Sequence, residues 1–558
     1  MYASDPRGKI RYAALATAVA LALGATGASA VSQSGEKKNM NRLGHTDLQG
    51  RPSYQPNVIQ YPDGRTILFV GMHSGVPNVP GRVTGCAAGL LPNPLNGGAC
   101  ESNGTMIIDV TDPRNPVEKA LIPAPAGGQA QMTRMCLGKD LPRGPADKAS
   151  RVYLQRNVQG GPSAGYQVWD VTDVEHPVMK SSVTGLRSTH KQWWECNTGL
   201  TYAPGSKNAA PLWRQSQAML VFDWGDPTAT PTYIRTFGLP GGQPGATGPV
   251  PNSLHGAISA HEHPQAAQPL ARSPDVIGNR IYAAWGVGDD GVMTIIDRKK
   301  LLPAAYGGTW DGSNPDTPTE AQLVGPGSPT VGYFTMSPDQ GGHTSMPVFG
   351  MKPPSYGKFN EFQTRDIVLL ASEATADGVD GRCNEAPHWA FVVDVTVENS
   401  MTSPPGTRVE HDPYHGPMVL STMSVDERSG AQSKRGNYCS RGARFGVHSV
   451  EENFRNPMYG KLTAIAYFNG GVRMWDIREP QAPREVGFYV PEANANTDSD
   501  GYMTNNVEID NRGYVYIVDR NGAGMDILEL TGCAKQIVDK GHTCDDLANN
   551  NAASNGGK

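Results

Sequence analysis

An apolar stretch ending in an aspartate recurs along the chain, and this repeat constrains the fold more than any other feature. The clearest copies occupy residues 107–113, 168–173 and 474–480. Less regular copies occupy residues 221–227, 295–298, 392–396 and 525–529. A short pattern that returns through a whole chain indicates a repeat fold, in which each unit buries its apolar face against its neighbours.

Short runs of β-forming residues precede each aspartate in pairs separated by turn residues. Residues 57–61 and 67–71 form one such pair, and residues 506–510 and 514–518 form another. These pairs predict hairpins. A further strand, such as residues 484–489, follows the aspartate phrase. Four strands per unit and seven units predict an all-β chain folded as a seven-bladed β-propeller of four-stranded antiparallel blades. Six or eight blades remain alternatives, because the spacing between the aspartates varies.

The aspartate phrase resembles the repeat of the LVIVD-repeat family, whose units end in a similar apolar run followed by an Asp-Pro turn. The match is good at residues 107–116, 168–177 and 474–483 and partial elsewhere. The resemblance implies an exported β-propeller and says little about activity. The residues themselves favour a structural role for the aspartates, since such side chains accept hydrogen bonds from turn backbone.

The N-terminus has the pattern of an export signal. Arg7, Lys9 and Arg11 precede a small apolar run, and Ala28 to Ala30 form a small-residue cleavage site. A retained anchor is less favoured, because the run is shorter than the roughly 20 residues of a spanning helix. We therefore expect a periplasmic or secreted protein divided into a signal peptide (1–30), a flexible segment (31–44), a propeller (45–532), a disulfide-linked segment (533–548) and a disordered tail (549–558).

The eight cysteines agree with an oxidising compartment. None forms the Cys-x-x-Cys spacing of zinc or thiol-redox sites. Pairing between neighbours in sequence predicts four disulfides: Cys86–Cys100, Cys136–Cys196, Cys383–Cys439 and Cys533–Cys544. The net charge of -5 and the absence of a basic run argue against a nucleic-acid partner. No later segment is apolar enough to span a membrane.

Four histidines lie at or just before the expected first strand of a unit. They are His190, His255, His343 and His448. The first strand of each blade lines the axis of a propeller, so these side chains should converge at one mouth of the channel. Imidazole ligands without a thiolate favour copper or iron. For any one of these histidines taken alone, a hydrogen bond to the backbone of the neighbouring blade is the favoured role. Four of them at similar points in their units favour a metal or ligand site as much as a structural role.

The ends of the second strands should return to the same mouth, where they carry His73, Arg156, Arg214, Trp285, Glu373, Asn469 and Arg520. Among these, His73 is a further candidate ligand, and Arg156, Arg214 and Arg520 could attract a small anionic substrate. Glu195 and Glu451 follow the ring histidines and could orient ligands or move protons. Because residues 255, 261 and 263 differ by even steps, a continuous strand would also place His261 and His263 beside His255.

Three functions fit these observations. The first is an exported oxidoreductase with copper or iron held by axial histidines, an architecture similar to the histidine-ligated iron site of carotenoid oxygenases. The second is a non-catalytic binding propeller for an envelope, glycan or peptide partner, with Trp193, Trp194, Trp213 and Trp285 as contacts. For Trp193 and Trp194, packing in the core is the favoured alternative. A calcium-dependent hydrolase is less favoured, since Asn453, Asn506 and Glu508 offer only a loose ring of oxygens. The distances among the four ring histidines distinguish the first function from the second.

Overall fold

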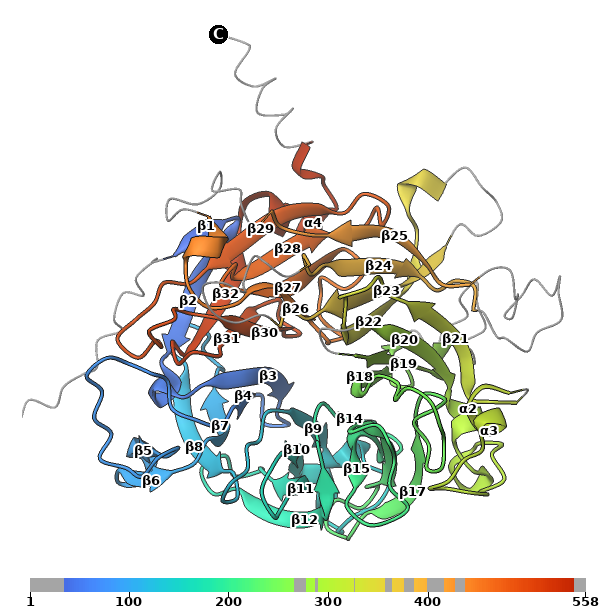
Figure 1. Cartoon of the computed structure of the whole chain (residues 1–558). Coiled ribbons are helices and arrows are strands. Elements are labelled where there is room, and N and C mark those ends of the chain that lie inside the picture. The colour runs from blue at the N-terminus through green and yellow to red at the C-terminus, as the bar shows by residue number, and fades with distance from the viewer. Residues whose placement is uncertain are drawn as a thin grey trace, which may run out of the picture.

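The computed structural model describes residues 35–264, 277–286, 290–325, 327–356, 364–375, 386–398, 416–426 and 437–545. Small antiparallel sheets stand in a ring around a common axis, and the first strand of each sheet lies innermost (Figure 1). This all-β arrangement is a β-propeller. The expected signal peptide (1–30) and C-terminal tail (549–558) lie outside the described residues.

Five sheets contain strands that follow one another in sequence, each paired antiparallel with the next. The first sheet contains β3 (Ser53–Gln60), β4 (Thr66–Met72), β7 (Gly104–Asp109) and β8 (Val117–Pro123), and the second contains β9 (Thr133–Leu137), β10 (Val152–Val158), β11 (Gly165–Asp170) and β12 (Val178–Thr184). The third contains β14 (Trp193–Trp194), β15 (Leu200–Lys207), β16 (Ala218–Asp223) and β17 (Thr232–Phe237), with β13 (Leu186–Arg187) beside β15. The fourth contains β18 (Leu254–Ser259), β19 (Arg280–Trp285), β20 (Val292–Asp297) and β21 (Thr330–Thr335), and the fifth contains β22 (Gly342–Met351), β23 (Arg365–Ser372), β24 (Ala390–Asp394) and β25 (Met418–Met423).

A nine-stranded sheet completes the ring. One part contains β26 (Phe445–Val450), β27 (Leu462–Phe468), β28 (Val472–Asp476) and β29 (Arg484–Val490). The other contains β30 (Thr504–Ile509), β31 (Val515–Asp519) and β32 (Met525–Leu530). The two parts are joined through one residue pair, Phe468 with Thr504.

Short elements decorate the ring. The hairpin of β5 (Leu91–Asn93) and β6 (Ala99–Glu101) forms a separate two-stranded sheet. The helices are α2 (Arg298–Leu301), α3 (Glu320–Val324) and α4 (Gly532–Lys540), and short 3-10 turns occur at Leu48–Gly50, Pro94–Asn96, Gly138–Asp140, Lys148–Ser150, Ala304–Tyr306, Pro354–Tyr356 and Tyr438–Ser440.

Strands near the N-terminus close the ring, which corrects the prediction of a flexible segment for residues 36–44; residues 31–34 lie outside the described residues. Strand β2 (Met40–Thr46) pairs antiparallel with β32, and β1 (Glu36–Lys38) pairs with β29. Met40 and Leu43 of β2 are buried, while polar residues between them obscure the strand pattern in the sequence. The first strands of the chain are therefore held by the last sheets.

The repeated aspartates are turn residues, as predicted. The carboxylates of Asp109, Asp170 and Asp476 each accept a hydrogen bond from the backbone N–H two residues later, at 2.9, 3.1 and 3.1 Å. Each of these aspartates ends the third strand of its sheet. Asp526 is different, because it lies near the start of β32 and accepts a hydrogen bond from Arg42 of β2.

Disulfides close three loops of the described chain. They join Cys86 to Cys100, Cys136 to Cys196 and Cys533 to Cys544, which confirms three predicted pairs. Cys439 is also disulfide-bonded, and its expected partner, Cys383, lies outside the described residues. Such bonds are typical of an oxidising compartment.

Among the described residues, none of the helices has the length and apolar character that crossing a membrane requires.

Ring closure by β2 predicts that its buried side chains stabilise the whole fold. Met40 is 1% exposed and packs in a cluster with Val486 and Leu530. Met40→Ala should lower the free energy of unfolding by about 2–5 kcal/mol, because it removes a buried side chain and leaves a cavity. Denaturant titration measures this loss. Lys38→Ala, at an exposed site of β1, should change it by less than about 0.5 kcal/mol. Equal effects of the two variants would contradict closure by β2.

Candidate metal centre on the propeller axis

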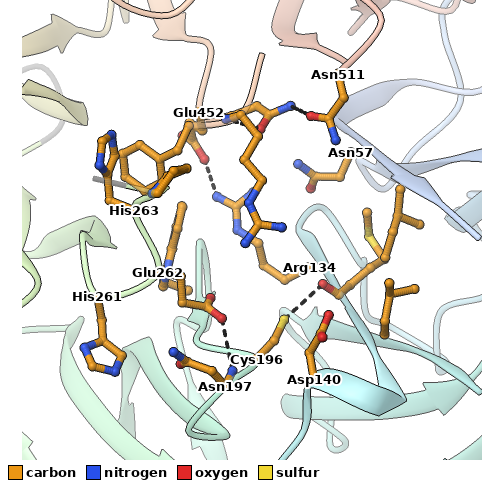
Figure 2. A pocket seen from close by; sticks show the side chains of 18 of the residues that line it. Asn57, Arg134, Asp140, Cys196, Asn197, His261, Glu262, His263, Glu452 and Asn511 are labelled. Carbon is orange, nitrogen blue, oxygen red and sulfur yellow. Dashed lines mark hydrogen bonds and ion pairs between the residues drawn. The ribbon is translucent and has the colours of Figure 1, made fainter. Parts of the chain in front are cut away.

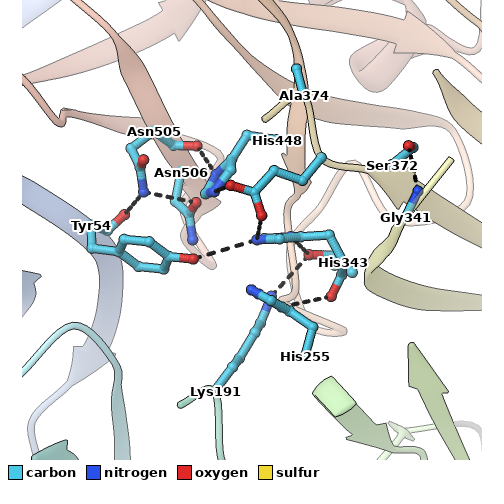
Figure 3. A network of polar contacts seen from close by, with 12 residues as sticks. Tyr54, Lys191, His255, Gly341, His343, Ser372, Ala374, His448, Asn505 and Asn506 are labelled. Atoms are coloured by element: carbon cyan, nitrogen blue, oxygen red, sulfur yellow. Dashed lines mark hydrogen bonds and ion pairs between the residues drawn. The ribbon is translucent and has the colours of Figure 1, made fainter. Parts of the chain in front are cut away.

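The four ring histidines converge on the axis. Consecutive ring centroids are 4.5 Å apart for His190 and His255, 3.7 Å for His255 and His343, and 4.3 Å for His343 and His448. His255, His343 and His448 are buried, and His190 is partly exposed. Imidazoles from three inner strands and from the segment before β14 thus form one cluster, part of which is visible in Figure 3.

Local irregularities of the inner strands aim these side chains at the axis. In β22, Gly342 and Thr344 pair with adjacent residues of β23, so His343 between them has no partner. His255 in β18 is bypassed in the same way. The register between β26 and β27 also shifts in the segment that contains His448. A β-bulge of this kind places an extra residue in one strand and redirects its side chain.

The same irregularity brings two further residues to the axis that sequence reasoning missed. Tyr54 is bypassed in β3, and Asn505 lies within the register shift of β30. The Tyr54 ring is 5.5 Å from the rings of both His190 and His448 and 4.8 Å from that of His73. Its hydroxyl lies 3.4 Å from Nε2 of His343. Tyr54 and Asn505 lie on the first strands of their units, as the ring histidines do. This shared position was the sequence signal that could have identified both residues.

Glu373 supplies a carboxylate to the cluster. It directly follows β23, at the end of a second strand, where the sequence placed it. Its Oε2 atom lies 3.8 Å from Nε2 of His343, and its Oε1 atom lies 3.5 Å from Nε2 of His448. Arg444 contacts the same carboxylate at 3.2 Å. Ligand atoms of His255, His343 and Glu373 all lie within 4.8 Å of one another, close enough to surround one ion.

Backbone contacts set the protonation of two rings. Nδ1 of His255 lies 3.1 Å from the carbonyl oxygen of His343, and Nδ1 of His448 lies 2.6 Å from that of Asn505. A carbonyl oxygen only accepts hydrogen bonds, so each Nδ1 must carry the proton and donate it. In the neutral ring the lone pair is then on Nε2, the atom available to a metal.

Burial keeps these imidazoles neutral. It lowers the pKa of His190 to about 3, with added repulsion from Lys191 and Arg520. Burial also lowers the pKa values of His73, His255, His343 and His448 well below their usual range. Neutral imidazole is the form that ligates metal ions.

Several ring nitrogens are buried without a hydrogen-bond partner, which fits a metal-binding role. They are Nε2 of His73, Nε2 of His448 and Nδ1 of His190. A buried polar atom left unpaired costs about 1–3 kcal/mol, so such atoms call for a ligand.

His261 and His263 do not join the cluster, so the prediction of a shared strand face is wrong. Strand β18 ends at Ser259, and the chain then turns. Nδ1 of His261 lies 2.9 Å from the carbonyl oxygen of Gly278, and the His263 ring packs 4.9 Å from that of Phe349. Both histidines line a cavity beyond the ends of the inner strands. His73 does approach the cluster, through its contact with Tyr54.

The two expected carboxylates have other partners. Glu195 is fully buried and forms an ion pair with Arg298 at 2.7 Å. Glu451 accepts hydrogen bonds from the backbone of Asn453 at 2.9 Å and the side chain of Asn456 at 3.1 Å. Neither glutamate contacts a ring histidine, so neither orients a ligand as expected. Glu373 is the carboxylate that lies beside the ring histidines.

The three expected arginines also differ in position. Arg156 is buried and donates to the carbonyl oxygens of Ile122 and Pro123 in the neighbouring sheet. Arg214 donates to carbonyl oxygens of the loop at Gly241 and Gly248. The guanidinium groups of both arginines thus donate to backbone carbonyl oxygens, so we no longer assign these two residues to substrate binding. Arg520 remains a candidate, because its charge helps to lower the pKa values of His73, His190 and His448.

The tryptophans expected to contact a partner are core residues. Trp193, Trp194, Trp213 and Trp285 are 8, 3, 4 and 0% exposed. They are therefore not available as an exposed aromatic surface.

No model of a known protein family matches this chain, and no curated protein matches it. The fold is similar to that of the Dos1 propeller (9% identity, TM-score 0.39, covering 88% of this chain and 96% of that one). It is also similar to a hypothetical selenium-binding protein from Sulfolobus tokodaii (10%, 0.41, 77% and 87%) and to hydrazine synthase from Kuenenia stuttgartiensis (12%, 0.40, 87% and 96%). Likeness at these TM-scores does not bear on function.

The buried carboxyl of Glu451 predicts a pH-dependent loss of stability. Burial raises its pKa to about 8, so the folded protein holds this proton more tightly than the unfolded chain does. The resulting stabilisation is complete at low pH and is lost as the pH rises from about 4.5 to 8. Glu451→Gln keeps the shape and removes the titration. Between pH 5 and 8 the wild type should lose at least about 2 kcal/mol more unfolding free energy than the variant. Parallel pH profiles in denaturant titrations would contradict this assignment.

Proposed function

We propose that the chain is an exported β-propeller metalloprotein, an oxidoreductase whose axial histidines bind copper or iron. One observation carries the proposal: four neutral imidazoles that are far apart in sequence lie with neighbouring ring centroids 3.7–4.5 Å apart. Hydrogen bonds fix two of these rings with Nε2 as the free ligand atom. A hydrophobic core gives no reason to gather such groups.

The ligands that we assign are His190, His255, His343, His448 and Glu373. Two histidines with a carboxylate are the donor set of many non-haem iron enzymes, while several imidazoles also suit copper. Calcium is less favoured, because it prefers a shell of oxygen atoms. The metal would supply redox chemistry and bind the substrate. Arg520 would draw a small anionic substrate toward it, and the Tyr54 hydroxyl would hydrogen-bond to a bound group.

Seven blades follow if the nine-stranded sheet is divided where β27 and β30 meet. The first part then has β26–β29 as its four strands, with β1 added beside β29, and the second has β30–β32 with β2 as its outermost strand. A single pairing residue at the junction supports this division. Membership of the LVIVD-repeat family remains a proposal supported by the repeated phrase alone.

Export is proposed from two features. The three disulfides are typical of an oxidising compartment, and residues 1–30 have the pattern of a signal peptide. We infer a periplasmic or secreted location.

Metal analysis of the purified protein tests the proposal. Protein produced with copper, iron and zinc present should contain about one copper or iron per chain, measured by inductively coupled plasma mass spectrometry. His255→Gln with His448→Gln should reduce this to about a tenth or less, since two ligands are lost. The matched control is His45→Gln with His176→Gln, two histidines that pair with aspartates away from the cluster. Equal metal content in both double variants would leave a non-catalytic binding propeller as the function.

The position of Glu373 beside two ring histidines predicts that its carboxylate strengthens metal binding. Glu373→Gln keeps the size of the side chain and removes the negative charge beside His343 and His448. Metal affinity should fall about 10–100-fold, because loss of a partner in or around a metal site has this effect. Competition with a chelator of known affinity measures it. Glu451→Gln serves as the control, as that carboxyl contacts asparagines instead. An unchanged affinity in Glu373→Gln would remove the carboxylate from the site.

A further inference from the structure

Lys191 is a buried cation directly beside the ring histidines. It follows His190 in the chain, and only 2% of its surface is exposed. Its side chain extends toward His255 and His343 (Figure 3). A lysine is almost never so fully buried without specific partners, because its ammonium group loses hydration there. The partners of Lys191 therefore show what this side chain does in the cluster.

The stem of Lys191 packs against the strand that carries His255. Lys191 forms an isolated parallel bridge with Gly256, the residue after His255. A methyl group added to Gly256 would lie 2.9 Å from Cδ and 3.2 Å from Cγ of Lys191, closer than ordinary van der Waals contact. A glycine at this position thus lets the lysine stem approach the backbone of β18. The path of the side chain is fixed by the segment that holds His255.

The ammonium group of Lys191 reaches the strand that carries His343. Its Nζ atom donates a hydrogen bond to Oγ1 of Thr344 at 2.9 Å. The same hydroxyl oxygen lies 2.9 Å from Nδ1 of His343. A hydroxyl oxygen has two lone pairs, so it can accept from Lys191 and from a protonated Nδ1 together. This arrangement leaves Nε2 of His343 with the lone pair that a metal needs.

The last partner of Lys191 follows the strand that carries His448. Nζ of Lys191 pairs with the carboxylate of Glu452, two residues beyond the end of β26. Glu452 is also buried and pairs with Arg134, which lines the cavity of about 1000 Å³ beyond the ends of the inner strands (Figure 2). Two cations thus hold one carboxylate, which anchors the tip of Lys191.

One side chain therefore touches the segments that carry all four ring histidines. It belongs to the segment of His190, and its contacts with Gly256, Thr344 and Glu452 reach the other three. Apolar packing holds the sheets together, while Lys191 connects the residues that lie directly beside the rings. These four segments are distant in sequence, so no local element could align them.

The ring of His343 depends most on this connection. Backbone carbonyl oxygens accept from Nδ1 of His255 and His448, whereas Nδ1 of His343 contacts a side-chain hydroxyl. A hydroxyl group can rotate, so it holds a ring less firmly than a carbonyl group does. The hydrogen bond from Lys191 occupies one lone pair of that hydroxyl and so restricts its rotation.

We propose that Lys191 is the positioning residue of the axial cluster. Through Gly256, Thr344 and Glu452 it holds the imidazoles in the arrangement that binds the metal, without contacting the metal itself. The proposal rests on the metal site proposed above. Residues that hydrogen-bond to metal ligands fix the orientation of those ligands, and the loss of one typically lowers metal affinity about 10–100-fold.

Lys191→Met tests the proposal, because it keeps an unbranched side chain and removes the ammonium group, while Glu452 retains its second cationic partner. The matched control is Lys207→Met, which makes the same change at a lysine paired with Asp316. Crystal structures without metal should show the His343 ring displaced by more than about 0.5 Å in Lys191→Met alone, since a binding site tolerates no larger error.

Copper binding is the second readout. The Cu²⁺ affinity, measured by competition with a chelator, should fall about 10–100-fold in Lys191→Met and stay within about threefold of wild type in Lys207→Met. The electron paramagnetic resonance spectrum of bound Cu²⁺ should change only in Lys191→Met, because it reports the ligand geometry. A purely structural role would lower stability and leave the spectrum of the folded, loaded protein unchanged.

A second pair of variants separates the hydrogen bond from packing. Thr344→Ser keeps the hydroxyl group, so its Cu²⁺ affinity should stay within about threefold of wild type and its spectrum should be unchanged. Thr344→Val keeps the shape and removes the hydroxyl group, so Cu²⁺ should bind at least about tenfold more weakly.

Two results would overturn the role of Lys191. One is a His343 ring that keeps its wild-type position in Lys191→Met, and the other is a wild-type Cu²⁺ affinity in both Lys191→Met and Thr344→Val. A wild-type protein that binds neither Cu²⁺ nor Fe²⁺ would contradict the metal site instead. The ring positions in the metal-free crystals would then still decide the role of Lys191.

Discussion

Pairing of β2 with β32 closes the ring that surrounds the axial cluster. The pairing joins residues 40–46 to residues 525–530 and so connects a strand near the start of the described chain to its last sheet. Each sheet contributes only one or two side chains to the centre, Tyr54 from β3, His343 from β22 and His448 from β26. No single sheet could form the site. Apolar packing between neighbouring sheets, including one core cluster that extends from Trp193 to Ile477, also holds the histidine-bearing inner strands around the axis.

The bulges are the second requirement, since a regular strand sends alternate side chains to its two faces. An inner strand of a propeller faces its neighbouring sheets, and neither face is the axis itself. At His255 and His343 the extra residue breaks the alternation and turns one side chain inward. The irregularity thus converts a packing strand into a strand that also presents a ligand.

Much of this arrangement could be predicted from sequence, and the remainder depended on long-range contacts. The aspartate turns marked the strands, and their spacing placed His190, His255, His343 and His448 on the axis. The choice of Glu195 over Glu373 failed because the partner of Glu195, Arg298, is distant in sequence. Arg156 was misplaced because its carbonyl partners belong to another sheet. The end of β18 at Ser259 separated His261 and His263 from His255, although their spacing alone suggested one face.

Anomalous X-ray diffraction of crystals of the metal-loaded protein, recorded on both sides of the copper and iron absorption edges, tests the central claim most directly. The account predicts one strong peak on the axis, within about 2–2.3 Å of nitrogen atoms from His255, His343 and His448. A fully loaded crystal with its peak elsewhere, or with no peak among these rings, would contradict a metal centre at the axial histidines.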